Sequence, residues 1–238
     1  MKKDYYAKKL SAERLRKVYE VASPRVRQYL EEEIRFVLDR IAPDARVLEL
    51  GCGYGRVLER LASRTKKIVG IDTSWESLKI AAQQGRAGSM LALMNAVSLG
   101  FAEKTFDLVA CIQNGISAFK VEPLDLMREA VRVTRAGGRV LFSSYSESFW
   151  PQRVEWFREQ AGHGLLGEID EEATGNGVIV CKDGFKATTF SPDAFLALAS
   201  SLGLTAEIFE VNESSIFCEI ICPPLTLPLS PSLGERAV

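Results

Sequence analysis

Short apolar runs alternate with amphipathic stretches over the middle of the chain. Five apolar runs have the length of β-strands, and the stretches between them repeat apolar residues at helical spacing. Strands are expected near residues 45–50, 67–71, 89–94, 106–112 and 138–144, and helices near 55–64, 74–84 and 122–135. This alternation predicts an α/β fold, with a mostly parallel sheet covered by helices on both faces.

The first 41 residues predict two helices. Ser23 and Pro24 have the residue types preferred at the N-cap and at the first helical position. The helix that follows has its apolar face at helical spacing, and Tyr29 lies on this face. Tyr29, together with Tyr19 of the first helix, is a candidate for a ligand pocket or for packing against the sheet.

The second half of the chain breaks the strand–helix alternation. Residues 145–190 predict an aromatic-rich helix and a β-hairpin, inserted before the last helix. Two further strands are expected near 206–211 and 215–222. Residues 223–238 contain four prolines and no periodic pattern, and we expect this tail to be disordered.

The segment between the first strand and the first helix carries the strongest functional signal. It reads Glu49-Leu-Gly-Cys-Gly-Tyr-Gly55, with three glycines at alternating positions. Glycine is needed where the backbone turns sharply or approaches a ligand closely. The helix N-terminus beyond it offers free N–H groups and the positive end of a dipole. The segment therefore predicts a site for a small ligand with a polar or anionic part.

A dinucleotide is the first alternative for that ligand. Dinucleotide-binding turns have the pattern G-x-G-x-x-G, whereas this chain has G-x-G-x-G. Glu49 would repel a pyrophosphate but suits a ligand with an ammonium group. Asp72, at the end of the second strand, lies 21 positions after Gly51. This is close to the roughly 20 expected for an acidic residue that binds the hydroxyls of a ribose.

Five motifs in order resemble those of the class I S-adenosylmethionine-dependent methyltransferases of the small-molecule type. The resemblance is strongest over residues 45–145 and extends more loosely to Cys222. The motifs are the glycine turn, Asp72, Asn95-Ala96, Phe106-Asp-Leu-Val109 and Arg135-Ala-Gly-Gly-Arg-Val-Leu141. Asn95 stands where the family often has Asp, and its amide oxygen still suits an adenine amino group.

The resemblance implies a Rossmann-like sheet of seven strands in the order 3-2-1-4-5-7-6, with S-adenosyl-L-methionine as cofactor. Residues 1–41 would lie over the cofactor mouth, and residues 42–222 would form the methyltransferase domain, with 145–190 as an inserted cap over the acceptor. The implied cofactor-binding residues are Glu49, Gly51, Cys52, Gly53, Gly55, Asp72, Thr73, Asn95, Ala96 and Ile112.

Gln113 and Asn114 follow the fourth strand directly, and we expect them beside the reacting methyl group, where each can hydrogen-bond the acceptor. His163, the only histidine, is a candidate general base in the inserted segment, or a surface loop residue. Tyr145 and Glu168 are weaker candidates. The loop lacks the Asn/Asp-Pro-Pro-Tyr/Phe and Pro-Cys sequences of enzymes that methylate nucleic-acid bases, which favours a small-molecule acceptor.

Composition and charge exclude several classes of function. The net charge of −1 gives no basic excess for nucleic-acid binding. No apolar run approaches the roughly 18 residues of a membrane span. Five cysteines and one histidine indicate buried thiols in a reducing cytoplasm and no metal site. The sequence predicts a cytoplasmic methyltransferase, monomeric or homodimeric; a NAD(P)-linked oxidoreductase and a non-catalytic cofactor-binding protein stay open as alternatives.

Overall fold

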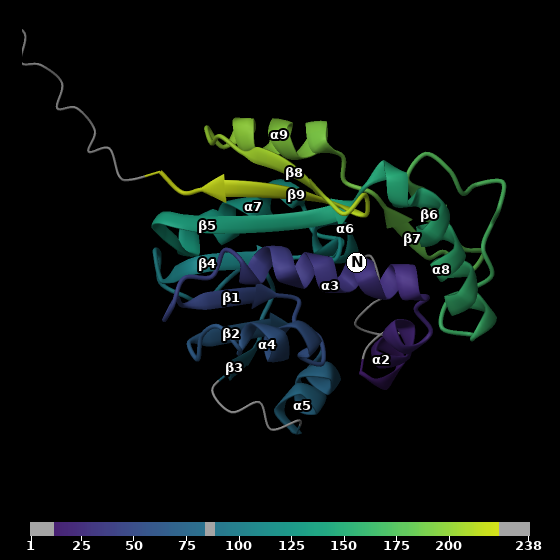
Figure 1. Cartoon of the computed structure of the whole chain (residues 1–238), viewed down its shortest axis with the longest axis horizontal. Coiled ribbons are helices and arrows are strands. Elements are labelled where there is room, and N and C mark those ends of the chain that lie inside the picture. Colours follow the sequence, from purple (N-terminus) through teal and green to yellow (C-terminus); the bar gives the residue numbers. More distant parts are fainter. Residues whose placement is uncertain (1–11, 84–88, 224–238) are drawn as a thin grey trace, which may run out of the picture.

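A seven-stranded sheet forms the centre of the computed structural model, which describes residues 12–83 and 89–223 (Figure 1). The expected disorder of the tail lies outside these residues, apart from Pro223. The strands are β1 (Val47–Leu50), β2 (Ile68–Asp72), β3 (Ser89–Leu93), β4 (Phe106–Cys111), β5 (Thr134–Tyr145), β8 (Glu207–Val211) and β9 (Ser215–Ile221).

The order of the strands confirms the expected topology. It is β3-β2-β1-β4-β5-β9-β8, which is 3-2-1-4-5-7-6 when the strands of this sheet are counted along the chain. Neighbouring strands from β3 to β5 are parallel, and β9 runs antiparallel to both β5 and β8. The strand order reverses between β1 and β4, because β2 and β3 lie on one side of β1 while β4 and β5 lie on the other. At such a point a parallel α/β sheet opens a crevice for ligands.

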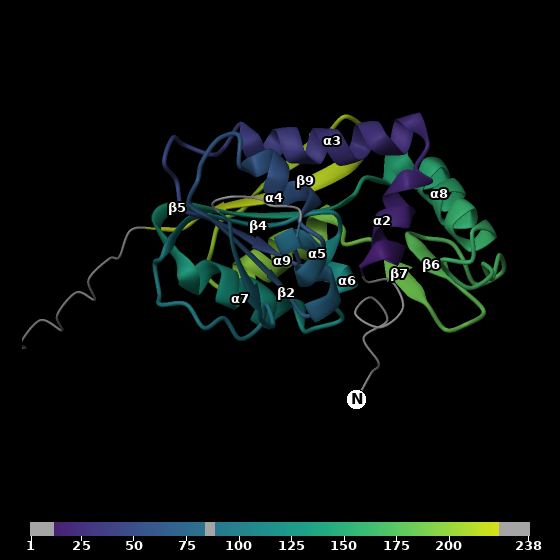
Figure 2. The ribbon, with the colours of Figure 1, turned by 90° about the horizontal axis from the view of Figure 1, so that it is seen from below.

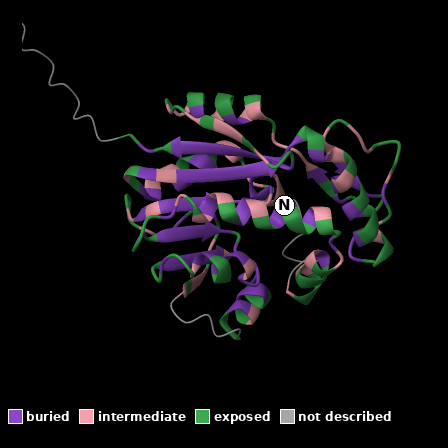
Figure 3. Ribbon diagram, viewed as in Figure 1, coloured by how far each residue is buried: buried purple, intermediate pink, exposed green. Residues whose placement is uncertain are grey.

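Helices cover both faces of the sheet. Helices α3 (Pro24–Leu38), α4 (Arg56–Leu61) and α5 (Trp75–Gln83) pack on one face. Helices α7 (Pro123–Val133) and α9 (Pro192–Ser201) pack on the other (Figure 2). Because each helix presents an apolar stripe to the sheet, the central strands are buried on both sides (Figure 3).

The inserted segment forms a separate apolar cluster beyond the end of the sheet. It contains a short 3₁₀ turn (Glu147–Phe149), α8 (Trp150–Gly162) and the hairpin strands β6 (Val178–Val180) and β7 (Lys186–Thr188). Side chains from α2 (Glu13–Glu20) and from the start of α3 join this cluster. The indole N–H of Trp156 donates to the backbone oxygen of Val18, which ties α8 to α2 at 3.1 Å.

Two elements differ from the sequence expectation. Strand β5 begins at Thr134 rather than near residue 138, because Thr134 pairs with Phe106 before the register shifts within the pair. Helix α6 (Gly115–Ala118) stands where the sequence indicated a loop, and four residues are too few to show helical periodicity.

Within the described residues, no helix is long and apolar enough to cross a membrane. The same part of the chain holds no group of three or more histidine, cysteine, aspartate or glutamate side chains that could bind a metal ion. All five cysteines are buried as free thiols.

Candidate functional site

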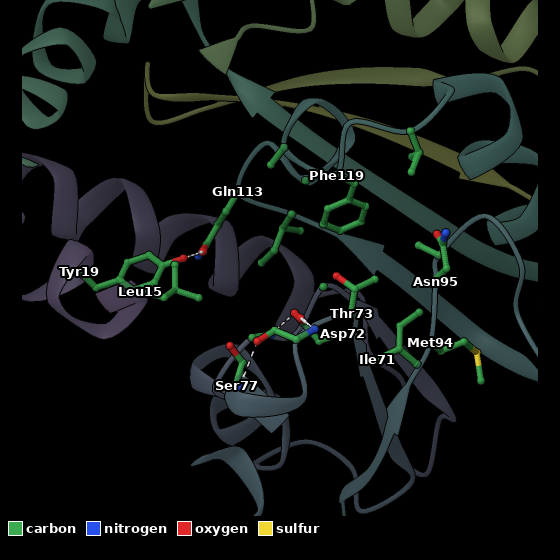
Figure 4. Close-up of a pocket in the computed structure, with 18 residues that line it drawn as sticks. Leu15, Tyr19, Ile71, Asp72, Thr73, Ser77, Met94, Asn95, Gln113 and Phe119 are labelled. Atoms are coloured by element: carbon green, nitrogen blue, oxygen red, sulfur yellow. Dashed lines mark hydrogen bonds between the residues drawn. The ribbon is translucent and has the colours of Figure 1, made fainter. Parts of the chain in front are cut away.

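A cavity of about 210 Å³ opens at the carboxyl ends of β1, β2 and β4, and we name it cavity 1 (Figure 4). It lies at the topological switch point of the sheet. Tyr19 lines it, as do eight of the predicted cofactor-binding and acceptor-binding residues: Gly51, Gly53, Asp72, Thr73, Asn95, Ala96, Ile112 and Gln113. They come from four separate segments, so the fold brings the predicted cofactor residues together at one place.

Three other predicted cofactor-binding residues do not line cavity 1. Glu49 is 4 % exposed within β1 and does not line cavity 1, although its charge helps to raise the pKa of Tyr19, which burial raises first. Burial and the nearby carboxylates raise the pKa of the Cys52 thiol. Gly55 is the left-handed N-cap of α4, with φ of 84°. For these three residues, direct contact with a cofactor stays a prediction.

Two glycines of the turn lack room for a side chain. Gly51 has φ of 74°, and a Cβ there would lie 2.5 Å from the ring of Phe119. Gly53 has φ of 53°, and its Cβ would lie 3.0 Å from Leu15 of α2. The bare backbone thus lets the Phe119 ring and α2 approach the turn at the edge of cavity 1.

We expect Gly51→Ala to destabilise the fold and to weaken cofactor binding. The left-handed backbone costs an alanine roughly 1–2 kcal/mol, and the clash with Phe119 costs about 1–3 kcal/mol more. Urea unfolding and titration with S-adenosylhomocysteine measure the two effects. Gly162→Ala is the control, because a Cβ at Gly162 meets nothing within 4 Å. Equal unfolding free energies in the two variants would contradict the packing argument.

Asp72 organises the floor of cavity 1. One of its carboxylate oxygens accepts a hydrogen bond from the backbone N–H of Gly53 at 2.8 Å, and the other accepts from Ser74 at 2.7 Å. The side chain therefore joins the tip of β2 to the glycine turn after β1. A carboxylate oxygen accepts more than one hydrogen bond, so these contacts are compatible with binding to ribose hydroxyls.

The loop after β4 has an unusual backbone. Gln113 and Asn114 have φ of 57° and 60°, a left-handed conformation that is uncommon for residues other than glycine. The N–H of Gln113 is shared between Glu33 Oε2 and Ser143 Oγ, each at 2.8 Å. The side chain of Asn114 donates to the backbone oxygen of Thr188 at 3.0 Å. Contacts from distant segments thus hold the backbone of Gln113 and the side chain of Asn114 in place.

The side chain of Gln113 forms a hydrogen bond with Tyr19 at the edge of cavity 1. Its Oε1 accepts a hydrogen bond from the Tyr19 hydroxyl at 3.1 Å (Figure 4). Burial raises the pKa of Tyr19, so the hydroxyl keeps its proton and stays a donor at neutral pH. Gln113 Nε2 is buried and has no hydrogen-bond partner within the described part of the chain.

Glu33 is a buried carboxyl that the sequence did not single out. It lies on α3 with no exposed surface, and burial raises its pKa to about 7 although hydrogen bonds from Ser143 and Gln113 lower it. Helical periodicity placed position 33 beside apolar neighbours. A charged residue on a buried helical face is the signal that could have identified it.

A second, smaller cavity of about 70 Å³, cavity 2, lies between α2, α3, α8 and the loop after β4. Cavities 1 and 2 share Leu15, Tyr19, Gln113 and Ala118 as lining residues. Asn114 and Tyr145 line cavity 2, as do Tyr29, Trp156 and Phe157. Three aromatic side chains of the inserted segment, Tyr145, Trp156 and Phe157, therefore face a cavity next to cavity 1, whereas Phe149 and Trp150 do not line it.

The structure does not bring His163 to either cavity. His163 is exposed at the C-cap of α8 and lines neither cavity 1 nor cavity 2. The structure therefore gives no support to its role as a general base. Four further residues that the sequence offered no reason to select, Leu15, Ser77, Met94 and Phe119, line cavity 1. Leu, Met and Phe are common in ordinary cores and Ser is common on surfaces, so only the fold identifies these residues.

The lining of cavity 1 fits S-adenosylmethionine. Gly51 and Gly53 present backbone without side chains, and Asp72 presents a carboxylate at the end of β2. Met94 and Phe119 add apolar surface suited to a flat base. Asn95 and Ala96 line the same cavity. Asn95 Oδ1 accepts the Val97 N–H at 3.1 Å and, like any amide oxygen, can accept a second bond.

Comparisons with known proteins agree with this geometry. Residues 48–142 match the family model described as a methyltransferase domain. The ubiquinone biosynthesis O-methyltransferase of Aliivibrio fischeri strain MJ11 is 28 % identical over 107 residues, which cover 43 % of this chain and 45 % of that protein. The match therefore spans less than half the length of that relative.

Two solved structures share the fold over most of the chain. The PH0226 protein of Pyrococcus horikoshii OT3 has a TM-score of 0.62 at 20 % identity, over 93 % of this chain and 99 % of that one. The N-methyltransferase NodS of Bradyrhizobium japonicum WM9, in complex with S-adenosylhomocysteine, has a TM-score of 0.54 at 17 % identity, over 84 % and 86 %. Residues 48–142 thus match a methyltransferase domain, and the chain shares the fold of these two solved structures.

Proposed function

We propose that this protein transfers a methyl group from S-adenosylmethionine, bound in cavity 1, to a small-molecule acceptor. The observation that carries the proposal is the convergence of Gly51, Asp72, Asn95 and Gln113 on one cavity from four strand ends. In the sequence these residues are spread over more than sixty positions, and they share no structural task other than lining this cavity.

The residues of cavity 1 would bind and orient the cofactor and would not themselves take part in a chemical step. When bound, S-adenosylmethionine supplies an activated methyl group on a positively charged sulfur, which an acceptor displaces in line. The carboxylate of Asp72 would hold the ribose hydroxyls, and Asn95 with Ala96 would contact the adenine edge. Because the methyl group is already activated, holding the acceptor in line with it is the main contribution left to the protein.

Cavity 2 supports the assignment of a small molecule as the methyl acceptor. It adjoins cavity 1 through Tyr19 and Gln113, and its other walls are mostly aromatic or aliphatic. A relative is named as an O-methyltransferase of ubiquinone biosynthesis and a structural neighbour as an N-methyltransferase, so both oxygen and nitrogen acceptors occur among similar proteins. A small organic molecule suits the site better than a nucleic acid or a protein chain.

A thermal melt with added ligands tests the cofactor. S-adenosylmethionine, S-adenosylhomocysteine, NAD and NADP are each added at a hundredfold the expected dissociation constant. Such a ligand stabilises the fold by about 2.7 kcal/mol, which for a chain of this size raises Tm by roughly 5–10 °C. We expect a shift with the two sulfur-containing nucleosides alone.

The other results identify the alternatives. A shift with NAD or NADP instead would move the chain to the oxidoreductases and overturn the proposal. Binding of S-adenosylmethionine without transfer of labelled methyl to any compound of a broad acceptor set would favour a non-catalytic cofactor-binding protein. Transfer of the labelled methyl group to one acceptor, with formation of S-adenosylhomocysteine, would establish the reaction.

A further inference from the structure

Cavity 2 differs from cavity 1 in the chemistry of its walls. We propose that it is the acceptor site and that it selects a compact, uncharged molecule carrying a hydroxyl or carbonyl oxygen, which the side-chain amide of Gln113 holds. This inference rests on the proposed function, since it assigns the second substrate of the same reaction.

The walls of cavity 2 offer no charge to an ion. Among the thirteen described residues that line it, none is Asp, Glu, Lys, Arg or His. Burial raises the pKa of Tyr145 to about 12, and it raises the pKa of Tyr29 as well, so both phenols are neutral. An ion that left water for this cavity would lose its hydration without gaining a charged partner, which costs several kcal/mol.

Aromatic walls by themselves would attract a cation, but here two guanidinium groups already occupy ring faces. The Cζ of Arg153, a residue with no exposed surface, lies 4.2 Å from the centre of the Tyr145 ring and 5.7 Å from that of Phe157. The Cζ of Arg56 lies 4.5 Å from the centre of the Tyr19 ring. A second cation would meet the repulsion of these groups.

An acidic group also lies near the cavity, but it faces another partner. Glu33 is one helical turn from Tyr29 and does not line cavity 2. Its carboxylate accepts the backbone N–H of Gln113. Glu33 is therefore part of the support of the loop, and it does not present a counter-ion to a bound molecule.

Gln113 offers a hydrogen-bond donor to a molecule in cavity 2. Its Oε1 is engaged by Tyr19, while Nε2 is buried without a partner and lies in a residue that lines both cavities. A buried amide donor without a partner is unfavourable, and an acceptor oxygen that bonds to it would remove this penalty. The hydrogen bond would place that oxygen at the wall shared with cavity 1.

The size of cavity 2 limits what enters. Its volume of about 70 Å³ is roughly half of the 150 Å³ or so of an engineered cavity that binds benzene. A compact group therefore enters without large movements of the walls. Ala187 of β7 lines the cavity with the smallest of its side chains, together with Ala118, and is the place where added volume would fill it.

The experiment compares three probes of similar size in the presence of saturating S-adenosylhomocysteine. They are 2-propanol, isopropylammonium and acetate, each with four non-hydrogen atoms, and ligand-detected NMR titration gives their dissociation constants without turnover. We expect 2-propanol to bind at least about tenfold more tightly than either ion, as the cost of an unpaired buried charge requires. Tighter binding of either ion, or equal binding of all three, would overturn the proposed selectivity.

A variant that fills cavity 2 tests whether the alcohol binds there. Ala187→Leu should weaken 2-propanol binding at least tenfold and leave the affinity for S-adenosylhomocysteine within about twofold. Ala199→Leu is the matched control, since Ala199 is also buried but lies on α9 and packs in the main core of the sheet. Ala187→Val adds less volume to the same strand and serves if the leucine variant does not fold. Unchanged 2-propanol binding in a folded variant would place the acceptor elsewhere.

Failure of this inference differs from failure of the proposed function. If S-adenosylhomocysteine does not bind the unmodified protein, the proposed function falls. If it binds and the alcohol shows no preference, only the assignment of cavity 2 falls.

Discussion

Replacing Asp72 by alanine is expected to weaken S-adenosylmethionine binding by about 2–4 kcal/mol, which corresponds to a roughly 30- to 1,000-fold higher dissociation constant. Two hydrogen bonds to ribose would be lost. The turn would also loosen, because the carboxylate accepts the N–H groups of Gly53 and Ser74. Isothermal titration of the folded variant with S-adenosylhomocysteine measures the effect.

A matched control separates binding from stability. Asp107 also accepts a backbone N–H, that of Arg46 at 2.7 Å, but it does not line cavity 1. Asp107→Ala should lower the free energy of unfolding and leave the affinity unchanged. If Asp72→Ala binds as tightly as the unmodified protein, the assignment of the ribose site is wrong.

Glu33→Gln is expected to remove a pH dependence of stability. Burial raises the pKa of Glu33 from 4.5 to about 7 in the folded protein. The folded state therefore binds a proton that the unfolded state releases. The resulting stabilisation is present below pH 4.5 and is lost as pH rises through 7. From pH 5 to pH 8, the variant should gain about 2–3 kcal/mol of unfolding free energy relative to the unmodified protein.

Urea unfolding of both proteins at pH 5 and pH 8 measures this difference. Glu31→Gln, on the exposed side of the same helix, is the control, and its effect should be under about 1 kcal/mol at both pH values. A constant difference between Glu33→Gln and the unmodified protein across this range would show that Glu33 does not change its proton between pH 5 and 8.

The parts of the fold that the sequence predicted are those encoded by local pattern. Apolar runs placed β1, β2 and β4, and the residue types of Ser23 and Pro24 marked the start of α3, where the Ser23 hydroxyl accepts the Val26 N–H. The glycine turn and Asp72 were visible because a turn and a strand tip require particular residue types. Parallel strands end at one edge of the sheet, so these motifs were expected to converge.

The sequence did not reveal contacts between segments that lie far apart along the chain. Glu33 and Tyr19 reach Gln113 across 80 and 94 positions, and no local pattern encodes such a contact. His163 was a candidate because of its chemistry alone, but α8 ends with it exposed to solvent. A residue type indicates what a side chain can do, while the fold decides what it can reach.

The sequence by itself determined where the central strands and the glycine turn lie, because periodicity and turn chemistry act over short stretches of chain. The expected strand order and cofactor came from the resemblance of its motifs to a known family. The tertiary structure alone decided that α2 and α3 lie against the loop after β4 and that a second cavity with uncharged walls adjoins the first. Helices on a sheet can pack in several ways with similar apolar burial. Which side chains enclose a cavity is therefore settled by the packing of the whole chain.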